Sequence, residues 1–343
     1  MPNTKQERND IFDYAKGIGI ILVVYAHVAR GVFNAGLPIN HDFYVLADRI
    51  IYSFHMPLFF FISGYFLLKS LAKRSAVQLI GNKAGTVLYP YLVWSLLQGI
   101  VEVALAKYTN GHVQLKDIFT LLWQPRAQFW FLYVLFGVFT MAALLYRNPS
   151  PPWTSLVLGL AILYFLGGYS PVDVYMLNAM PNFFVYFAFG VSFSHILPKL
   201  NLSRYSWLIS LAALFAIGQW GIIQDLTLLS INLLPISKLV LGMLGITLTL
   251  SVSQYLSKLK WSFLSFLGRY SLEIYLMHIF FSSGIRILLY KNAGVTDPTL
   301  HLLLGTLLGV AIPPLVAIYA RRLGWTWLFS IKPRSLTPVN VQN

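Results

Sequence analysis

Residues 13–28 read DYAKGIGIILVVYAHV, and this stretch decides how the rest of the chain is interpreted. Lys16 and His27 lie eleven residues apart, so on an α-helix their headings differ by only about 20° and the rise between them is roughly 16 Å. The hydrocarbon core of a bilayer is roughly 30 Å thick, so a helix that enters at Lys16 carries His27 to about mid-membrane. An ionisable residue at that depth is costly to place and predicts a functional site. The alternative is a buried histidine that bonds a neighbouring helix; Asp13 and Lys16 on the same face favour function.

The composition of the whole chain is that of an integral membrane protein. Hydrophobic residues make up 57% and charged residues 10% of the 343 residues, and the mean hydropathy is +0.67, which excludes an ordinary soluble globular protein. The net charge is +14, but the basic residues lie in short segments between apolar runs, the pattern of membrane topology rather than of a nucleic-acid-binding face. There is no cysteine, which excludes disulfides, thiolate catalysis and cysteine metal sites, and we expect no metal.

Ten apolar stretches predict membrane-spanning helices. They run approximately over residues 14–33, 44–68, 86–106, 128–146, 153–169, 182–198, 205–223, 236–256, 270–290 and 299–320. We therefore expect an all-α, polytopic integral membrane protein that forms one membrane-embedded domain over residues 1–343, with short cytoplasmic tails at about 1–12 and 322–343. The first apolar run is not followed by a convincing small-residue cleavage site, so we expect the first helix to be retained.

The basic residues predict the orientation of these spans. Ten spans put both termini and every second loop on one side, and that side holds 17 of the 25 lysines and arginines. These are Lys5, Arg8, Lys16, Lys69, Lys73, Arg74, Lys83, Arg147, Lys199, Arg204, Lys258, Lys260, Arg269, Arg321, Arg322, Lys332 and Arg334. Because cytoplasmic loops are enriched in lysine and arginine, both termini are predicted to be cytoplasmic.

The second span contains the sequence SFHMPLFFFISGY at residues 53–65. Pro57 cannot donate to the carbonyl of Ser53 and is expected to kink the helix. His55 lies close to that freed carbonyl, and we interpret it as a histidine that stabilises the kink in preference to a catalyst. Ser63 and Gly64 predict a close contact between helices.

The ninth span begins with GRYSLEIYLMH at residues 268–278 and rises from the cytoplasmic side. Glu273 is then shallow in the membrane and His278 deeper. A carboxylate in the membrane needs a partner, and Arg269, one turn below, is the local candidate. The alternative is that this pair only anchors the end of the helix.

Together these motifs resemble the acyltransferase-3 family of membrane O-acyltransferases. The similarity rests on DxxKG and VVxxH within residues 13–27, HMPLFFFISGY at 55–65 and SLEIYLxH at 271–278, in the family's order and spacing. The sequence WFLYxLF at 130–136 is similar to the fucose 4-O-acetylase-like branch of the family.

The resemblance implies an enzyme that transfers an acetyl group from cytoplasmic acetyl-CoA to a hydroxyl of a surface or lipid-linked saccharide, in a bacterial inner membrane. It also implies that Lys16 and His27 form the catalytic core. Many members carry Arg-x-x-Arg after the second span, whereas here only Lys83 precedes Tyr89 and Pro90, so the anchoring of the CoA phosphates differs. We also expect this chain to lack the family's separate periplasmic hydrolase-like domain, because it ends soon after Arg334.

The chemistry expected of such an enzyme assigns roles to the candidate residues. A base or nucleophile is needed at the thioester carbonyl, and histidine can be neutral and basic near pH 7. His27 is expected to deprotonate the sugar hydroxyl directly, or else to be acetylated itself, and we favour the direct base. The predicted catalytic residues are His27, Lys16 and Glu273, and the predicted substrate-binding residues are Arg269, Lys83, Asp13, His278 and His55.

Two other classes of protein fit the composition. A secondary transporter would bind its substrate at polar midplane residues, but the chain has no internal repeat and its ionisable residues are biased towards the cytoplasmic half. A non-enzymatic assembly protein is the third possibility, and consumption of acetyl-CoA would separate an enzyme from both.

Overall fold

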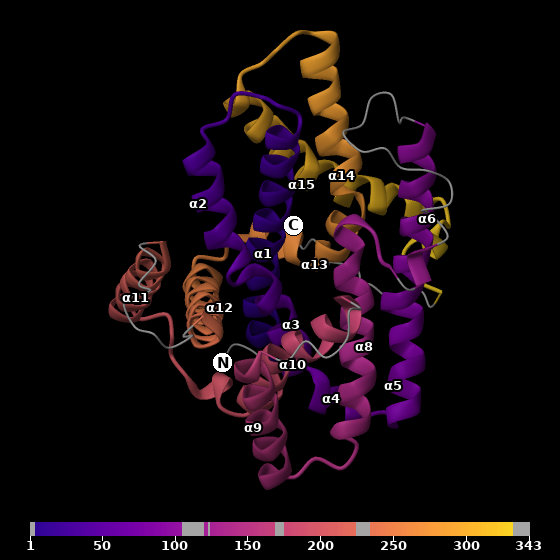
Figure 1. The fold of residues 1–343 in the computed structure, drawn as a ribbon. Helices are drawn as coiled ribbons and strands as arrows, with labels where there is room; N and C mark the ends of the chain where they lie inside the picture. Colours follow the sequence, from indigo (N-terminus) through magenta and orange to yellow (C-terminus); the bar gives the residue numbers. More distant parts are fainter. Residues whose placement is uncertain (1–3, 105–119, 123, 169–174, 224–233, 332–343) are drawn as a thin grey trace.

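The computed structural model describes residues 4–104, 120–122, 124–168, 175–223 and 234–331 (Figure 1). Every regular element in these ranges is helical, and none of them contains a strand. In chain order the elements are α1 (Thr4–Asn34), α2 (His41–Tyr52), α3 (His55–Tyr65), α4 (Leu67–Leu71), α5 (Ala76–Lys83), the π-helical η1 (Ala84–Leu88), α6 (Tyr89–Ala104), the short 3₁₀ turns η2 (Thr120–Leu122) and η3 (Ala127–Phe129), α8 (Trp130–Leu145), α9 (Pro151–Gly167), α10 (Tyr175–Phe193), η4 (Leu197–Lys199), α11 (Tyr205–Ile223), α12 (Leu234–Lys258), α13 (Ser262–Arg269), α14 (Ser271–Ile287), the π-helical η5 (Leu288–Asn292), α15 (Pro298–Arg322) and η6 (Thr326–Leu328).

The prediction of an all-α polytopic membrane protein is confirmed. In the described ranges, seven helical segments are long enough and apolar enough to cross a membrane. They are Asp10–Asn34, His41–Leu71, Ala76–Ala104, Ala127–Leu145, Pro235–Lys258, Ser271–Asn292 and Pro298–Arg322, and the apolar α9 is shorter. Helices also cover the other predicted spans, but the count of ten and the cytoplasmic placement of both termini stay predictions.

Helix α1 is the centre of the bundle. It packs against α2, α3, α12, α13, α14 and α15, and Figure 1 shows it between α12 and α8. Two glycines allow α13 to approach it closely: a Cβ on Gly268 would lie 1.7 Å from the carbonyl oxygen of Asp13, and one on Gly17 would lie 2.3 Å from that of Leu264. Small residues permit such approaches between membrane helices. This contact brings the Asp13–Gly17 part of α1 next to the end of α13, which carries Arg269.

A second close contact joins α3 and α10. A Cβ on Gly64 would lie 2.0 Å from the carbonyl oxygen of Phe187, and one on Gly190 would lie 2.0 Å from that of Phe61. The predicted close packing is therefore confirmed at Gly64, whereas Ser63 lines the cavity described below.

The second span is interrupted three to four residues before Pro57, at the Ser53 carbonyl that the prediction expected this proline to free. The helix ends at Tyr52 and restarts at His55, so Ser53 and Phe54 form the break. Pro57 then occupies the first turn of α3, where backbone N–H groups have no partner within the helix and proline is tolerated.

The sixth span is also displaced from its predicted range of 182–198. Helix α10 runs from Tyr175 to Phe193 and includes Pro181, which the prediction treated as lying outside the helix. Proline is tolerated in membrane helices because neighbouring groups can satisfy the freed carbonyl.

Both predicted tails contain ordered structure. Helix α1 already begins at Thr4. After α15, residues 323–331 fold back onto η1 and α6. Trp94 Nε1 donates to the Leu328 carbonyl at 2.7 Å, and the Gly85 carbonyl accepts from Ser330 Oγ at 3.0 Å and from the Ile331 amide at 3.3 Å. This segment is part of the domain, because it covers the cavity described next.

Candidate active site

A cavity of about 520 Å³ lies between α1, α3, α8, α14, the α5–η1 junction and residues 326–330. Apolar side chains from α1, α3 and α8 line its walls: Ile20, Val23, Met56, Phe59, Phe131, Leu132 and Leu135. Its charged lining consists of Lys16, Lys83, Arg269, Glu273 and Arg321. An apolar cavity with a few convergent polar groups is the usual form of a small-molecule site, and its volume is within the usual range of about 300–1,000 Å³.

The cations of this cavity come from the predicted cytoplasmic ends of four helices. Lys16 Nζ lies 2.6 Å from Asp13 Oδ1, so these two residues, three positions apart on α1, form a local ion pair. Lys83 Nζ lies 3.8 Å from the centre of the Phe139 ring, a cation–π contact. Asp13 does not line the cavity and acts on it only through Lys16.

Glu273 pairs with a different arginine from the one that the sequence predicted. Its partner is Arg321 at the end of α15, whereas Arg269 donates to Ser265 Oγ at 3.2 Å on its own helix. The Glu273 side chain is 2% exposed, so this ion pair is buried. Among the described residues, Glu273 Oε2 and Arg321 Nη1 are buried without a hydrogen-bond partner. The predicted Arg269 pairing is wrong because α15 packs against α14 and brings Arg321, 48 positions away in the chain, to Glu273.

Two histidines meet just beyond the inner end of the cavity. Lys16, Ile20 and Val23 line it at helical spacing, and His27 is one turn further along the same face of α1. His278 is likewise one turn beyond the cavity-lining Tyr275 on α14. The two imidazole rings are 5.0 Å apart between centroids and nearly perpendicular, at 71°.

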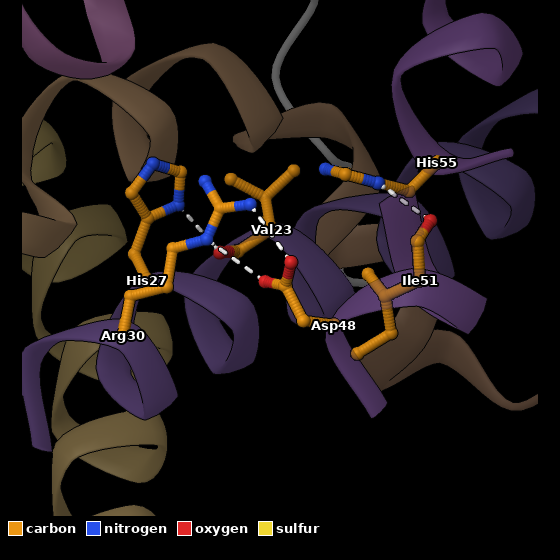
Figure 2. A network of polar contacts seen from close by, with 6 residues as sticks. All are labelled: Val23, His27, Arg30, Asp48, Ile51 and His55. Atoms are coloured by element: carbon orange, nitrogen blue, oxygen red, sulfur yellow. Dashed lines mark hydrogen bonds and ion pairs between the residues drawn. The ribbon is translucent and has the colours of Figure 1, made fainter. Parts of the chain in front are cut away.

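Hydrogen bonds assign the same tautomer to three histidines. The Nδ1 atom lies 2.8 Å from the Val23 carbonyl in His27, 2.7 Å from the Ile51 carbonyl in His55, and 2.8 Å from the Tyr275 carbonyl in His278; Figure 2 shows the first two bonds. A carbonyl oxygen only accepts, so each neutral ring carries its proton on Nδ1 and keeps the Nε2 lone pair. Each Nε2 is therefore a potential base.

The predicted role of His55 needs a correction. Its Nδ1–H donates to Ile51 at the end of α2, not to the Ser53 carbonyl next to Pro57. His55 does not line the cavity, and Figure 2 places it beyond an ion pair formed by Arg30 and Asp48.

Of the predicted site residues, Lys16, Lys83, Arg269 and Glu273 line one cavity, and His27 and His278 lie together beyond its inner end. Sequence reasoning missed three charged residues nearby: Arg321, Arg30 and Asp48. The signal for the last two was available, because both are ionisable residues within predicted spans. The described residues contain no group of three or more His, Cys, Asp or Glu side chains that could hold a metal.

Fold and site together define a polytopic, all-helical membrane protein with a cation-lined cavity that leads to paired histidines. The chain belongs to the acyltransferase-3 family, because it matches the family described as "Acyltransferase domain" over residues 9–318. The resemblance of its motifs to this family is therefore confirmed.

Two curated relatives carry the name Nodulation protein NolL. The one from Mesorhizobium japonicum (strain LMG 29417 / CECT 9101 / MAFF 303099) is 26% identical over 230 residues, which cover 64% of this chain and 58% of the relative. The one from Sinorhizobium fredii (strain NBRC 101917 / NGR234) is 31% identical over 139 residues, which cover 40% of this chain and 36% of the relative. No solved structure matches the chain significantly.

Proposed function

We propose that this protein is a membrane O-acetyltransferase that moves an acetyl group from cytoplasmic acetyl-CoA to a hydroxyl of a cell-surface or lipid-linked saccharide. The observation that carries the proposal is a cavity lined by four cations, with the His27–His278 pair one helical turn beyond its lining residues Val23 and Tyr275. Membership of the acyltransferase family supports acyl transfer. Its two relatives from bacteria support a bacterial inner membrane as the location.

The donor would bind with its phosphates at the cationic end. CoA is highly anionic at its nucleotide end, and phosphate oxygens form strong, charge-assisted hydrogen bonds with lysine and arginine. Lys16, Lys83, Arg269 and Arg321 would supply these contacts. The thioester arm would run along the apolar wall of α1 to His27, over a rise of roughly 16 Å. Glu273 would orient Arg321 and so act through it.

The paired histidines would carry out the transfer. His27 Nε2 accepts the proton of the acceptor hydroxyl while its oxygen attacks the thioester carbonyl. The new C–O bond forms, the C–S bond breaks, and the CoA thiolate leaves as a thiol by taking the proton from His27. His278 would hold the ring of His27 in place through the perpendicular contact of their rings.

The test is acetyl-CoA turnover by the purified protein, with release of free thiol as the readout. His27→Ala should abolish transfer while the protein still folds, because the proposal assigns the removal of the hydroxyl proton to His27 and gives the neighbouring His278 only a positioning role. His41→Ala is the matched control, since this histidine is exposed at the start of α2. A well-folded His27→Ala variant with near-normal turnover would show that the catalytic assignment is wrong.

The same assay tests the two open alternatives. A protein mass increase of one acetyl group after rapid quenching would favour an acetylated His27 over direct proton abstraction. A secondary transporter would move a solute without cleaving acetyl-CoA, so thiol release that requires His27 speaks against it.

A further inference from the structure

A charged pair lies on the outer side of His27, away from the cation-lined cavity. Arg30 is one turn beyond His27 on α1, and Asp48 comes from α2. Arg30 Nε lies 2.8 Å from Asp48 Oδ1, and Arg30 Nη2 lies 3.0 Å from Asp48 Oδ2, so the two groups bond at both pairs of atoms (Figure 2). In the predicted orientation of α1 this pair faces the outer half of the membrane.

The pair has a fixed geometry and is only partly covered by the protein. The guanidinium carbon of Arg30 lies 3.7 Å from the centre of the Tyr52 ring, which fixes the plane of the guanidinium. The side chains of Arg30 and Asp48 are 39% and 23% exposed, whereas Glu273 in the cavity is 2% exposed. Ionisable residues in membrane spans are costly to place, and they indicate a functional site by default.

A third polar group faces the same pair. In Figure 2 the ring of His55 points from α3 towards Arg30 and Asp48, and His27 lies on their other side. Arg30 is close enough to interact electrostatically with both histidines. His55 is fully buried at 0% exposure, and its Nε2 has no hydrogen-bond partner among the described residues. Since Nδ1–H already donates to Ile51, this Nε2 can only accept.

We propose that Arg30, Asp48 and His55 bind the acceptor saccharide on the outer side of His27. A carboxylate and an imidazole Nε2 accept hydrogen bonds from sugar hydroxyls, and a guanidinium donates to hydroxyl and ring oxygens, so this set matches a vicinal diol. The inference rests on the proposed function and assigns the acceptor to this place. Donor and acceptor then reach His27 from opposite sides. The sugar hydroxyl that loses its proton to His27 is adjacent on the ring to the hydroxyls that Arg30 and Asp48 bind.

The test separates the affinity for each substrate. The purified protein is given acetyl-CoA with methyl α-L-fucoside, methyl β-D-glucoside or methyl N-acetyl-β-D-glucosaminide, and KM is measured for both substrates from thiol release. Asp48→Asn keeps the size of the side chain but removes its charge. With the glycoside that the wild type uses best, we expect KM for the glycoside to rise at least about tenfold, as for loss of a hydrogen bond to a charged group, and KM for acetyl-CoA to change less than about twofold.

The matched control is Glu102→Gln. Glu102 pairs with Arg126 at 2.6 Å and is exposed to a similar extent, 22%, but this pair belongs to α6 and the segment before η3. Glu102→Gln should leave both KM values unchanged. If Asp48→Asn does not fold, Arg30→Lys and His55→Gln decide the question by the same titration, since both keep a polar group at the site.

The outcomes distinguish the two proposals. An unchanged KM for the glycoside in folded Asp48→Asn or Arg30→Lys, with an active wild type, would overturn the acceptor site alone. An equal rise in Glu102→Gln would also overturn it, because any partly exposed, ion-paired carboxylate would then have the same effect. A wild type that releases no thiol with any glycoside would overturn the proposed function and this inference with it.

Discussion

Replacement of Arg321 tests how the buried pair at the cavity is held together. Arg321→Ala leaves the Glu273 carboxylate, 2% exposed, without its only ion-pair partner among the described residues. Breaking a buried pair by removing one member costs about 3–5 kcal/mol, because an uncompensated charge stays buried. Removing both charges, in Arg321→Ala combined with Glu273→Gln, should restore most of this loss, because no charge then remains buried; Glu273→Gln alone completes the set of four proteins.

The control for this experiment is Arg269, which the sequence predicted as the partner of Glu273. In the structure Arg269 bonds Ser265 instead and is not paired with Glu273. Arg269→Ala should therefore lower the free energy of unfolding by about 1 kcal/mol, the usual net contribution of one hydrogen bond, because it leaves no buried carboxylate without its partner.

The measurement is unfolding by a graded series of denaturing detergent in mixed micelles, followed by the fluorescence of the nine tryptophans. The four proteins of the Arg321–Glu273 cycle give the coupling energy between the two residues. A loss in Arg269→Ala as large as that in Arg321→Ala, or a double variant no more stable than Arg321→Ala, would refute the reasoning.

Two further predictions concern the donor and the helix contacts. Lys16→Ala should raise KM for acetyl-CoA more than KM for the acceptor, because it removes a charge-assisted contact worth roughly 1.5–3 kcal/mol. Sealed vesicles of known orientation should support transfer only when acetyl-CoA is on the cytoplasmic face. Transfer that requires acetyl-CoA on the outer face would contradict the arrangement. Gly268→Ala should destabilise the protein by several kcal/mol and lower its melting temperature, because the new Cβ would lie 1.7 Å from the Asp13 carbonyl oxygen. The control is Gly284→Ala on α14, where the new Cβ has no atom within 4 Å. This variant should be as stable as the wild type or more stable by up to about 1 kcal/mol. Similar melting temperatures for Gly268→Ala and Gly284→Ala would show that α1 and α13 do not pack so closely.

The sequence alone determined the features that follow from local geometry. Helical spacing aligned Lys16 with His27, and the same face of α1 lines the cavity and leads to that histidine. Apolar length predicted where the helices lie, apart from the break at Ser53 and Phe54 and the early start of α10. The Asp13–Lys16 pair was predictable for the same reason, since its members are three residues apart on one helix.

Only the tertiary structure decided which helices meet and which charges pair. Glu273 finds Arg321 rather than its neighbour Arg269, Arg30 finds Asp48 across two helices, and residues 323–331 close over the cavity. Membrane helices are apolar on all sides, so the sequence pattern does not mark the face that meets a partner. Close approach at small residues and hydrogen bonds between helices select the arrangement, and both depend on segments far apart in the chain.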